Sequence, residues 1–307
     1  MLDFSNSKIL IVGDVMLDKY YFGKVDRISP EAPVPIVNIQ KEESRLGGAS
    51  NVANNIVSLG GHSLLCGVIG HDLFGKEIER ISRHKNIDTF LLKTSSPTIT
   101  KARIIGGKQQ IVRVDYEDKS ELNADNKKLF RDTISRILPE YDILVISDYG
   151  KGLISEDLCR YLIKLAHKYD KKVIIDPKGK NWEKYSGADI VTPNVKELSD
   201  IVGYTVPNTD RAIEKAAREA ITNNHLTALL VTRSDKGMSL IGPIPPIHIP
   251  THSEEVFDVS GAGDTVVATL GLCLAAGFEI SEAMRTANIA AGIVVKKVGT
   301  ATLTIEE

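Results

Sequence analysis

The 307-residue chain lacks several features that mark particular classes of protein. Its three cysteines, Cys66, Cys159 and Cys273, are far apart and lie in apolar stretches. We therefore expect buried, reduced thiols, and neither a disulfide framework nor a zinc site. No apolar run approaches the length of a membrane span, and residues 1–12 do not resemble a secretory signal. These absences lead us to expect a soluble, cytoplasmic protein.

Charge of either sign is not in excess. There are 38 Lys and Arg against 40 Asp and Glu, which gives a formal net charge of −2. A nucleic-acid or membrane surface is therefore not expected as a partner, and any phosphate recognition has to be local. Internal repeats, low-complexity tracts and flexible linkers are also missing.

Short apolar stretches rich in Val and Ile alternate with amphipathic stretches along most of the chain. Strands are expected at 8–12, 64–69, 143–147, 173–176, 189–191 and 228–232, and helices near 51, 76–84, 156–168, 211–223, 266–276 and 281–297. This alternation predicts a doubly wound α/β fold, with a mostly parallel sheet covered by helices on both faces, in one domain over 1–307. Two segments, 20–40 and 98–117, have strand patterns without helices between them and predict a separate small sheet.

The most informative stretch is Asp258-Val259-Ser260-Gly261-Ala262-Gly263-Asp264-Thr265, which stands before the apolar run 266–276. Small residues at a helix start let the backbone approach a ligand, and the free amides of the first turn attract an anion. Asp264 places a proton acceptor in the same turn, which suggests phosphoryl transfer to a hydroxyl. The alternative is a tight loop in which Asp264 only offsets the helix dipole.

This string resembles the C-terminal signature of the ribokinase-like, or PfkB, carbohydrate kinases. The stretch Gly47-Gly48-Ala49-Ser50-Asn51-Val52-Ala53-Asn54 resembles the other signature of that family. The resemblance implies that Asp264 is the catalytic base, and that Gly261, Ala262 and Gly263 hold the transferring phosphate. It also implies that ATP and Mg²⁺ are used and that the small sheet is a lid over the sugar, which often pairs with its copy in a homodimer. Gly47, Gly48 and Asn51 are then expected to contact the sugar.

Further motifs resemble the nucleotide-binding parts of the same family. Asn194 and Glu197 have the spacing of its magnesium-associated motif and would orient waters on a Mg²⁺ bound to ATP, although a plain helix start is an equal alternative. The stretch 231–237 resembles the nucleotide loop, with Thr232, Ser234 and Gly237 as contacts. Asn288 is a weaker candidate for the adenine pocket, since packing alone would explain it.

A third set of motifs resembles the bacterial heptose 7-phosphate kinases within this family. They lie at 13–18, 28–35, 109–110, 113–115, 147–152 and 176–179. The resemblance implies transfer of the ATP γ-phosphoryl group to the anomeric hydroxyl of D-glycero-β-D-manno-heptose 7-phosphate, on the route to ADP-heptose for lipopolysaccharide. Many such kinases are fused to a nucleotidyltransferase. Since its His-x-x-His signature is not found here, we expect the stand-alone form.

Substrate contacts are expected where the first strand ends and in the lid. Asp14 and Asp18 follow that strand, at the edge where open α/β sheets gather ligands. The remaining expected substrate contacts are Gln110 and a cation for the sugar phosphate, chosen from Lys151, Lys178, Arg103 and Arg113. Lys151 is favoured because it lies between two glycines, and Lys178 is equally suited to ATP.

Two alternative functions stay open: another sugar kinase of the ribokinase or phosphofructokinase type, and a non-catalytic sugar-binding regulator. The intact base Asp264 argues against the regulator.

Two other patterns are judged not to be functional sites. Gly70 to Lys76 has P-loop spacing, but Glu77 replaces the hydroxyl residue that would hold magnesium, so a loop and a helix start are predicted. His248 and His252 have a zinc-like spacing without cysteines, and we expect a solvated loop.

Overall fold

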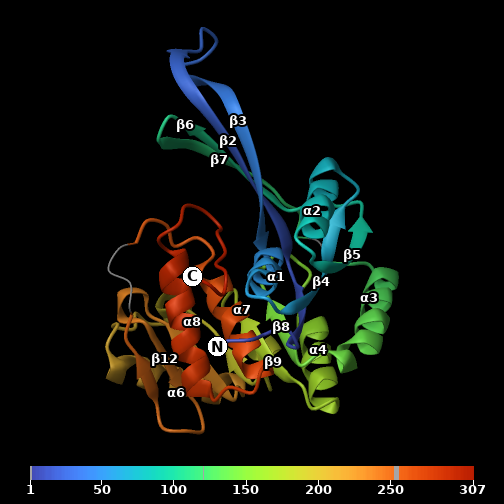
Figure 1. Cartoon of the computed structure of the whole chain (residues 1–307), viewed down its shortest axis with the longest axis vertical. Coiled ribbons are helices and arrows are strands. Elements are labelled where there is room, and N and C mark those ends of the chain that lie inside the picture. The colour runs from blue at the N-terminus through green and yellow to red at the C-terminus, as the bar shows by residue number, and fades with distance from the viewer. Residues whose placement is uncertain (1, 120, 252–255) are drawn as a thin grey trace.

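The computed structural model describes residues 2–119, 121–251 and 256–307. A large mixed sheet forms its body, and a small sheet projects from it (Figure 1). The large sheet has nine strands in the order β13-β12-β11-β10-β9-β8-β1-β4-β5. Its strands are β1 (Lys8–Gly13), β4 (His62–Gly70), β5 (Asp88–Thr94), β8 (Ile143–Ser147), β9 (Lys172–Asp176), β10 (Ile190–Val191), β11 (Ala228–Thr232), β12 (Met238–Ile241) and β13 (Ile247–Ile249). Every pairing is parallel except those of β12, so the expected mostly parallel sheet is confirmed.

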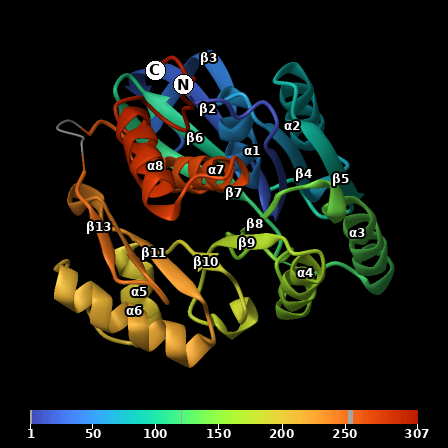
Figure 2. The same cartoon turned by 60° about the horizontal axis from the view of Figure 1, so that its bottom comes forward.

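Helices cover both faces of this sheet (Figure 2), as the doubly wound prediction requires. One core contains buried residues of α1 (Ala49–Ser58), α2 (Leu73–His84), α7 (Ala262–Ala275) and α8 (Ile280–Val294). The other contains those of α3 (Ala124–Ile137), α4 (Glu156–Lys168), α5 (Val195–Val202) and α6 (Asp210–Asn224). Short 3₁₀ turns lie at Leu138–Glu140, Glu183–Tyr185 and Ser234–Lys236.

The central strand β1 explains why the apolar stretches are continuous. Successive side chains of a strand point to opposite faces, so Ile9 and Ile11 enter one core while Leu10 and Val12 enter the other. A strand buried on both faces needs apolar residues at every position.

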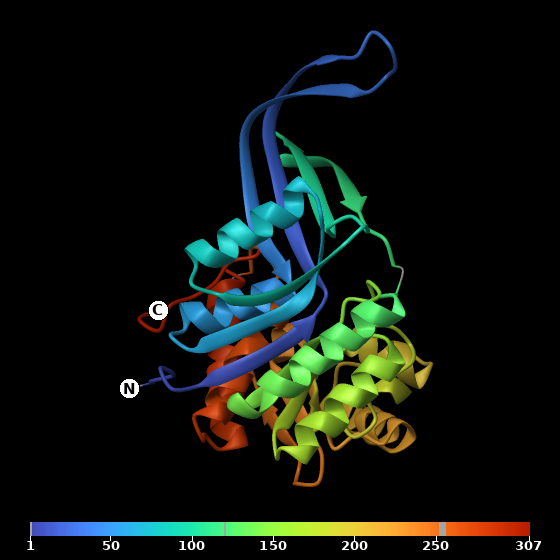
Figure 3. The ribbon, with the colours of Figure 1, turned by 90° about the vertical axis from the view of Figure 1, so that its right-hand side faces the viewer.

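The small sheet, which we call the lid, consists of β2 (Val15–Ile28), β3 (Pro35–Gly48), β6 (Thr100–Gly106) and β7 (Gln109–Tyr116). Its four strands have the order β3-β2-β6-β7, which confirms the strands expected in segments 20–40 and 98–117. The lid rises from the edge where β1 ends, and its β2–β3 hairpin reaches farthest from the body (Figure 3). That hairpin exposes Val25, Ile28 and Val34.

The cysteines and the P-loop-like stretch are as predicted. All three thiols are free and buried. Asp72 caps α2 by accepting a hydrogen bond from the Gly75 amide, so residues 70–76 are a strand end and a helix start. Within the described residues, no helix has the length and apolar character needed to cross a membrane.

The prediction of a solvated loop at His248 is wrong. His248 lies in β13, because the flanking Ile247 and Ile249 pair with β12 and Ile249 is buried. Its ring contacts Ser239 Oγ at 2.8 Å and Glu214 Oε1 at 3.2 Å. His252 lies outside the described residues.

Candidate active site

Polar residues gather where the parallel strands end. Asp14 follows β1, Asp148 follows β8, and Asp176 ends β9. These strands are neighbours, with Gly13 paired to Ser147 and Ser147 paired to Asp176. Parallel strands present their carboxyl ends at one edge, and this edge is where open α/β sheets bind ligands.

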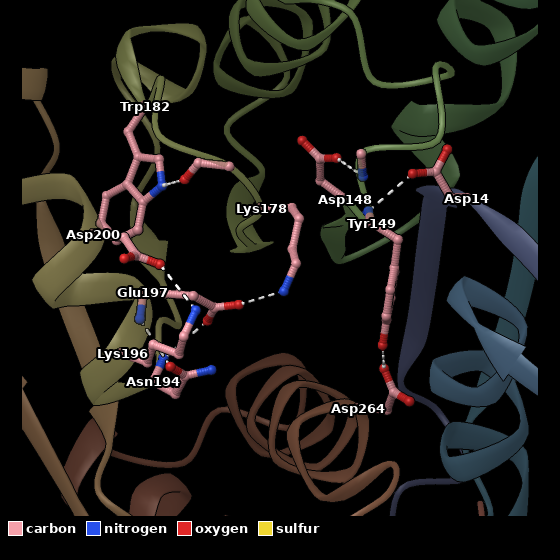
Figure 4. Close-up of polar contacts among 12 residues, drawn as sticks. Asp14, Asp148, Tyr149, Lys178, Trp182, Asn194, Lys196, Glu197, Asp200 and Asp264 are labelled. Atoms are coloured by element: carbon pink, nitrogen blue, oxygen red, sulfur yellow. Dashed lines mark hydrogen bonds and ion pairs between the residues drawn. The ribbon is translucent and has the colours of Figure 1, made fainter. Parts of the chain in front are cut away.

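Asp264 lies opposite this edge, in the first turn of α7. Its carboxylate is buried and held from two sides. The Tyr149 hydroxyl donates a hydrogen bond of 2.7 Å to Oδ1, as Figure 4 shows, and the Asn51 amide donates one of 2.7 Å to Oδ2. Tyr149 belongs to the loop after β8, and Asn51 belongs to α1. The carboxylate is therefore held between that loop and that helix.

The environment of Asp264 tunes its basicity. Burial raises the pKa of this carboxyl to about 6, while the hydrogen bonds from Asn51 and Tyr149 oppose the rise. Burial also raises the pKa of Tyr149 well above its usual range, so the phenol keeps its proton. A carboxylate that is ionised at neutral pH and more basic than usual suits a general base.

The start of α7 has the geometry expected of an anion cradle. Gly261 is the N-cap residue with a φ of 80°, and no side chain caps the helix. A Cβ at Gly261 would lie 2.7 Å from Asn51 Nδ2, whereas one at Gly263 would have no atom within 4 Å. Gly261 therefore lets the backbone pass close to Asn51, and the helix start is open at Gly263.

Gly47 and Gly48 are required by contacts within the chain. A Cβ at Gly47 would lie 2.5 Å from Asp18 Oδ2, and one at Gly48 would lie 2.6 Å from the Asp14 carbonyl oxygen. They let α1 start close to both aspartates, and this places Asn51 beside Asp264. Contact of these glycines with a sugar stays a prediction.

Asp14 organises the loop that carries Tyr149. Its carboxylate accepts hydrogen bonds from the amides of Tyr149 at 2.9 Å, Lys151 at 3.0 Å and Leu153 at 3.4 Å. Burial and the nearby Asp148 raise the pKa of Asp14 to about 6. The carboxylate oxygens of Asp14, which were expected to accept hydrogen bonds from the sugar, accept hydrogen bonds from these backbone amides in the structure.

The cations proposed for the sugar phosphate differ in their partners. Arg103 donates to Asp18 at 2.6 Å, Arg113 pairs with Asp115 at 2.8 Å, and Lys151 pairs with Glu117. Lys178 is 2.9 Å from Glu197 Oε1, and Figure 4 shows its side chain reaching toward Glu197 and Asn194. Gln110 is exposed near the far end of the β6–β7 hairpin, away from Asp264.

Lys101 was missed by the sequence analysis. It shares a lid row with Asp18 and Asp115, and its ammonium lies 5.5 Å from the centroid of the Tyr149 ring. In the described part of the chain it forms no ion pair. Burial lowers the pKa of Lys101, Asp18 opposes this, and the nearby Lys151, Arg103 and Arg113 lower the pKa further.

Asn194 and Glu197 form a capping box at the start of α5. The Asn194 side chain accepts from the Glu197 amide at 2.9 Å, and Glu197 Oε2 accepts from the Asn194 amide at 3.1 Å. The plain helix start that the sequence left open is therefore present, while a magnesium role stays a prediction. Asp176, also missed, lies beside them, and burial together with Asp264 and Glu197 raises its pKa well above the usual value.

The stretch 231–237 is held by a buried arginine. Arg233 donates to Asn208 at 2.9 Å, to Asp210 at 2.6 Å and to Ser239 at 2.8 Å. Thr232 ends β11, Ser234 begins the 3₁₀ turn, and Gly237 has a φ of 78°, where a Cβ would lie 2.0 Å from the Ile249 carbonyl oxygen. Asn288 is buried and donates to the Pro250 carbonyl at 2.7 Å, so packing explains it.

The residues that the sequence analysis missed differ in whether they lie inside one of the quoted motifs. Tyr149 lies inside the motif 147–152, and Asp176 begins the motif 176–179, but neither motif says where a side chain points. Lys101 had no signal beyond its place in a lid strand.

Comparisons with known proteins show the family of this chain. The family model of the pfkB family carbohydrate kinases matches residues 6–307. The chain is 46% identical to Bifunctional protein HldE of Haemophilus influenzae (strain PittEE) over 99% of its length and 63% of that protein. It is 43% identical to Bifunctional protein HldE of a Nitratiruptor species, over 98% of the chain and 64% of that protein. The chain thus spans less than two thirds of these relatives.

Solved structures show the same fold. Phosphofructokinase-2 from Escherichia coli, solved in complex with potassium, aligns with a TM-score of 0.80 at 20% identity, over 98% of this chain and 96% of that one. Arabidopsis thaliana ribokinase, complexed with ribose and ATP, aligns with a TM-score of 0.74 at 20% identity, over 97% and 96%. On the match over 6–307, the chain belongs to the pfkB family of carbohydrate kinases.

Proposed function

We propose that this chain uses ATP to phosphorylate the anomeric hydroxyl of D-glycero-β-D-manno-heptose 7-phosphate, giving the 1,7-bisphosphate on the route to ADP-heptose for lipopolysaccharide. The observation that carries the kinase part is the buried Asp264, held by Tyr149 and Asn51 beside the open start of α7. The identity of the sugar is supported by the motifs at 13–18 and 147–152 and by the 46% identity to Bifunctional protein HldE.

In the proposed reaction, the attacking hydroxyl lies against Asp264. It gives up its proton to the carboxylate as its oxygen bonds the γ-phosphorus of ATP, and the bond from that phosphorus to the β–γ bridging oxygen breaks to release ADP. Tyr149 and Asn51 keep the carboxylate oxygens aimed at the hydroxyl. The amides of Gly261 and Gly263 face the transferring group and stabilise its charge, while the Ala262 amide donates to the Val259 carbonyl oxygen at 3.2 Å. Phosphoryl transfer needs mainly this positioning and electrostatic stabilisation.

The carboxylates on the nucleotide side fit a divalent cation held through water. The described residues contain no cluster of three or more His, Cys, Asp or Glu that could cage a metal. Each oxygen of Glu197 already accepts one hydrogen bond but can accept another, and buried Asp176 gains from a nearby positive charge. Mg²⁺ suits this arrangement because it usually keeps several waters, and when bound with ATP it neutralises phosphate charge. Lys178 would assist there.

The structure changes which cation we propose for the substrate's own phosphate. Lys151, favoured from the sequence, is paired with Glu117, whereas Lys101 forms no ion pair with a described residue and lies near Asp18 as well as near Lys151, Arg103 and Arg113. A dianion would relieve the repulsion among these four cations. We therefore assign the main phosphate contact to Lys101, with Arg103, Arg113 and Lys151 as its neighbours.

The test is ADP release across a panel of sugars and sugar phosphates. Wild type should use heptose 7-phosphate far better than free heptose, because a buried charge left unpaired costs roughly 2–5 kcal/mol, or about thirtyfold to several-thousandfold in kcat/KM. Equal use of the two sugars would refute the sugar-phosphate assignment. Preference for ribose or fructose 6-phosphate would favour the other kinases of this family.

Variants separate the candidate cations. Lys101→Met should collapse the preference, Lys151→Met should reduce it less, and Lys108→Met, an exposed lysine in the β6–β7 turn, should leave it unchanged. A preference that survives Lys101→Met but falls in Lys151→Met would return the contact to Lys151.

We also propose a homodimer formed through the lid. The exposed Val25, Ile28 and Val34 on the β2–β3 hairpin support it, since a projecting sheet with apolar residues and open edges is a poor monomer surface.

A further inference from the structure

One lid residue contacts the C-terminal segment 295–300 directly. Arg45, near the end of β3, donates from Nη1 to the Val298 carbonyl oxygen at 2.5 Å and from Nη2 to Glu43 Oε2 at 3.0 Å. The sequence separation between Arg45 and Val298 is 253 residues, so the bond exists only when the lid stands in this position.

The surroundings of Arg45 are closely fitted. Its guanidinium lies 5.0 Å from the centroid of the Tyr20 ring, and that of Arg103 lies 5.1 Å from the same ring. Gly299 has a φ of 73°, and a Cβ there would lie 2.2 Å from Arg45 Nη1 and 3.1 Å from the Tyr20 hydroxyl. A glycine is therefore needed for the backbone to pass this close to the lid.

The other side of segment 295–300 holds the loop before α7. Asp258 Oδ2 accepts from the Gly299 amide at 2.8 Å, and Oδ1 accepts from the Ser260 amide at 2.9 Å. The amides of Phe257 and Asp258 donate to the Val295 carbonyl at 2.8 and 3.1 Å. The loop that runs into Gly261 is thus bonded to the segment that Arg45 holds.

We propose that Arg45 is a positioning residue that ties the lid to the phosphate cradle at Gly261–Gly263. The link runs from Arg45 through Val298 and Gly299 to Asp258 and Ser260. A sugar that binds Arg103 and Asp18 of the lid thereby also fixes the amides that face the transferring phosphate. The proposal rests on the phosphoryl-transfer site proposed above, but not on which sugar is used.

Hydrogen exchange on the enzyme without substrates tests the link itself. In Arg45→Met, amides in peptides covering 257–264 and 295–300 should exchange roughly tenfold to hundredfold faster, the change expected from losing a hydrogen bond given by a charged group. Arg45→Lys, which keeps a donor and the charge, should show an intermediate effect. Arg160→Met, at an exposed arginine of α4 that pairs with Glu156, is the matched control.

Kinetics then separate positioning from simple destabilisation. With whichever sugar wild type phosphorylates, Arg45→Met should lower kcat at least tenfold while the KM for ATP changes less than threefold. Gly299→Ala, which forces the segment away from Arg45, should reproduce that pattern. A lower melting temperature with wild-type kcat would indicate a structural role only.

The hydrogen-exchange experiment and the sugar panel test different claims. If no sugar of the panel is phosphorylated, the proposed function fails, but the exchange experiment still decides the link. Unchanged exchange at 257–264 in Arg45→Met overturns the proposal, as does a kcat drop matched by Arg160→Met.

Discussion

Removing the Tyr149 hydroxyl should move the pH dependence of the reaction. Tyr149→Phe deletes one of two hydrogen bonds to the Asp264 carboxylate and leaves the aromatic ring in place. Because the bond favours the ionised form, its loss raises the pKa of Asp264 above its present value of about 6.

The size of the shift follows from the hydrogen bond. A bond to a charged acceptor contributes about 1.5–3 kcal/mol, and one pKa unit corresponds to about 1.4 kcal/mol, so the pKa should rise by about 1–2 units. Asp264 works as a base only when deprotonated. The rate at pH 7 should therefore fall about twofold to tenfold, while at pH 9 most of the activity should return.

Tyr149→Phe also shows whether Asp14 or Asp264 sets the acid limb of the pH profile. Asp14 also has a pKa of about 6, but it accepts from the Tyr149 backbone amide, and this amide is unchanged in Tyr149→Phe. A shifted acid limb therefore belongs to Asp264.

The assay is kcat/KM from pH 5 to 9.5, measured by direct separation of ADP. Tyr161→Phe, which deletes a hydroxyl bonded to the Arg131 carbonyl oxygen on the other face of the sheet, is the control. An acid limb at the wild-type position, or a loss of rate that is equal at all pH values, would refute this view of Tyr149.

Other substitutions test the remaining assignments. Asp264→Asn should keep the fold and nucleotide binding but lose on the order of a hundredfold to ten-thousandfold in kcat, and wild-type turnover would remove Asp264 from the mechanism. Glu197→Gln should raise the Mg²⁺ concentration needed for half-maximal rate and, through the weakened capping box, lower stability by about 1 kcal/mol; an unchanged Mg²⁺ titration would leave Glu197 with the cap alone. Ile28→Asp should turn a lid dimer into a monomer in sedimentation at micromolar concentration, and a wild-type monomer would contradict the dimer.

The fold was predictable because its signals are local. The strands 143–147 and 228–232 and the helix 156–168 have the predicted bounds, since apolar strands buried on both faces and a capping Ser155 are visible in the sequence. Other bounds moved, such as that of β2, which begins at Val15, and the sequence analysis did not expect β5, α3, β12 or β13.

The site was less predictable because its side chains meet across long separations. Asp14 serves a loop 135 residues away, and Asn51 serves a carboxylate 213 residues away. Both were expected to face the sugar, since a motif shows that a polar group is needed but not what it contacts. Lys101 escaped notice because its role depends on Arg103, Arg113 and Lys151 each having an acidic neighbour.

The charged residues of the site form two groups on different sides of Asp264. Lys101 and its cationic neighbours lie on the lid side of Asp264, and Lys178 lies among Asp176 and Glu197 on the other side. Under the proposed function, the phosphate of the sugar would meet the cations of the lid, and the phosphates of the nucleotide would meet Lys178 together with a divalent cation near Asp176 and Glu197. The hydroxyl and the γ-phosphate would then meet between these two places, against Asp264 and the start of α7. Such a separation would let one small site bind two anions without either taking the place of the other.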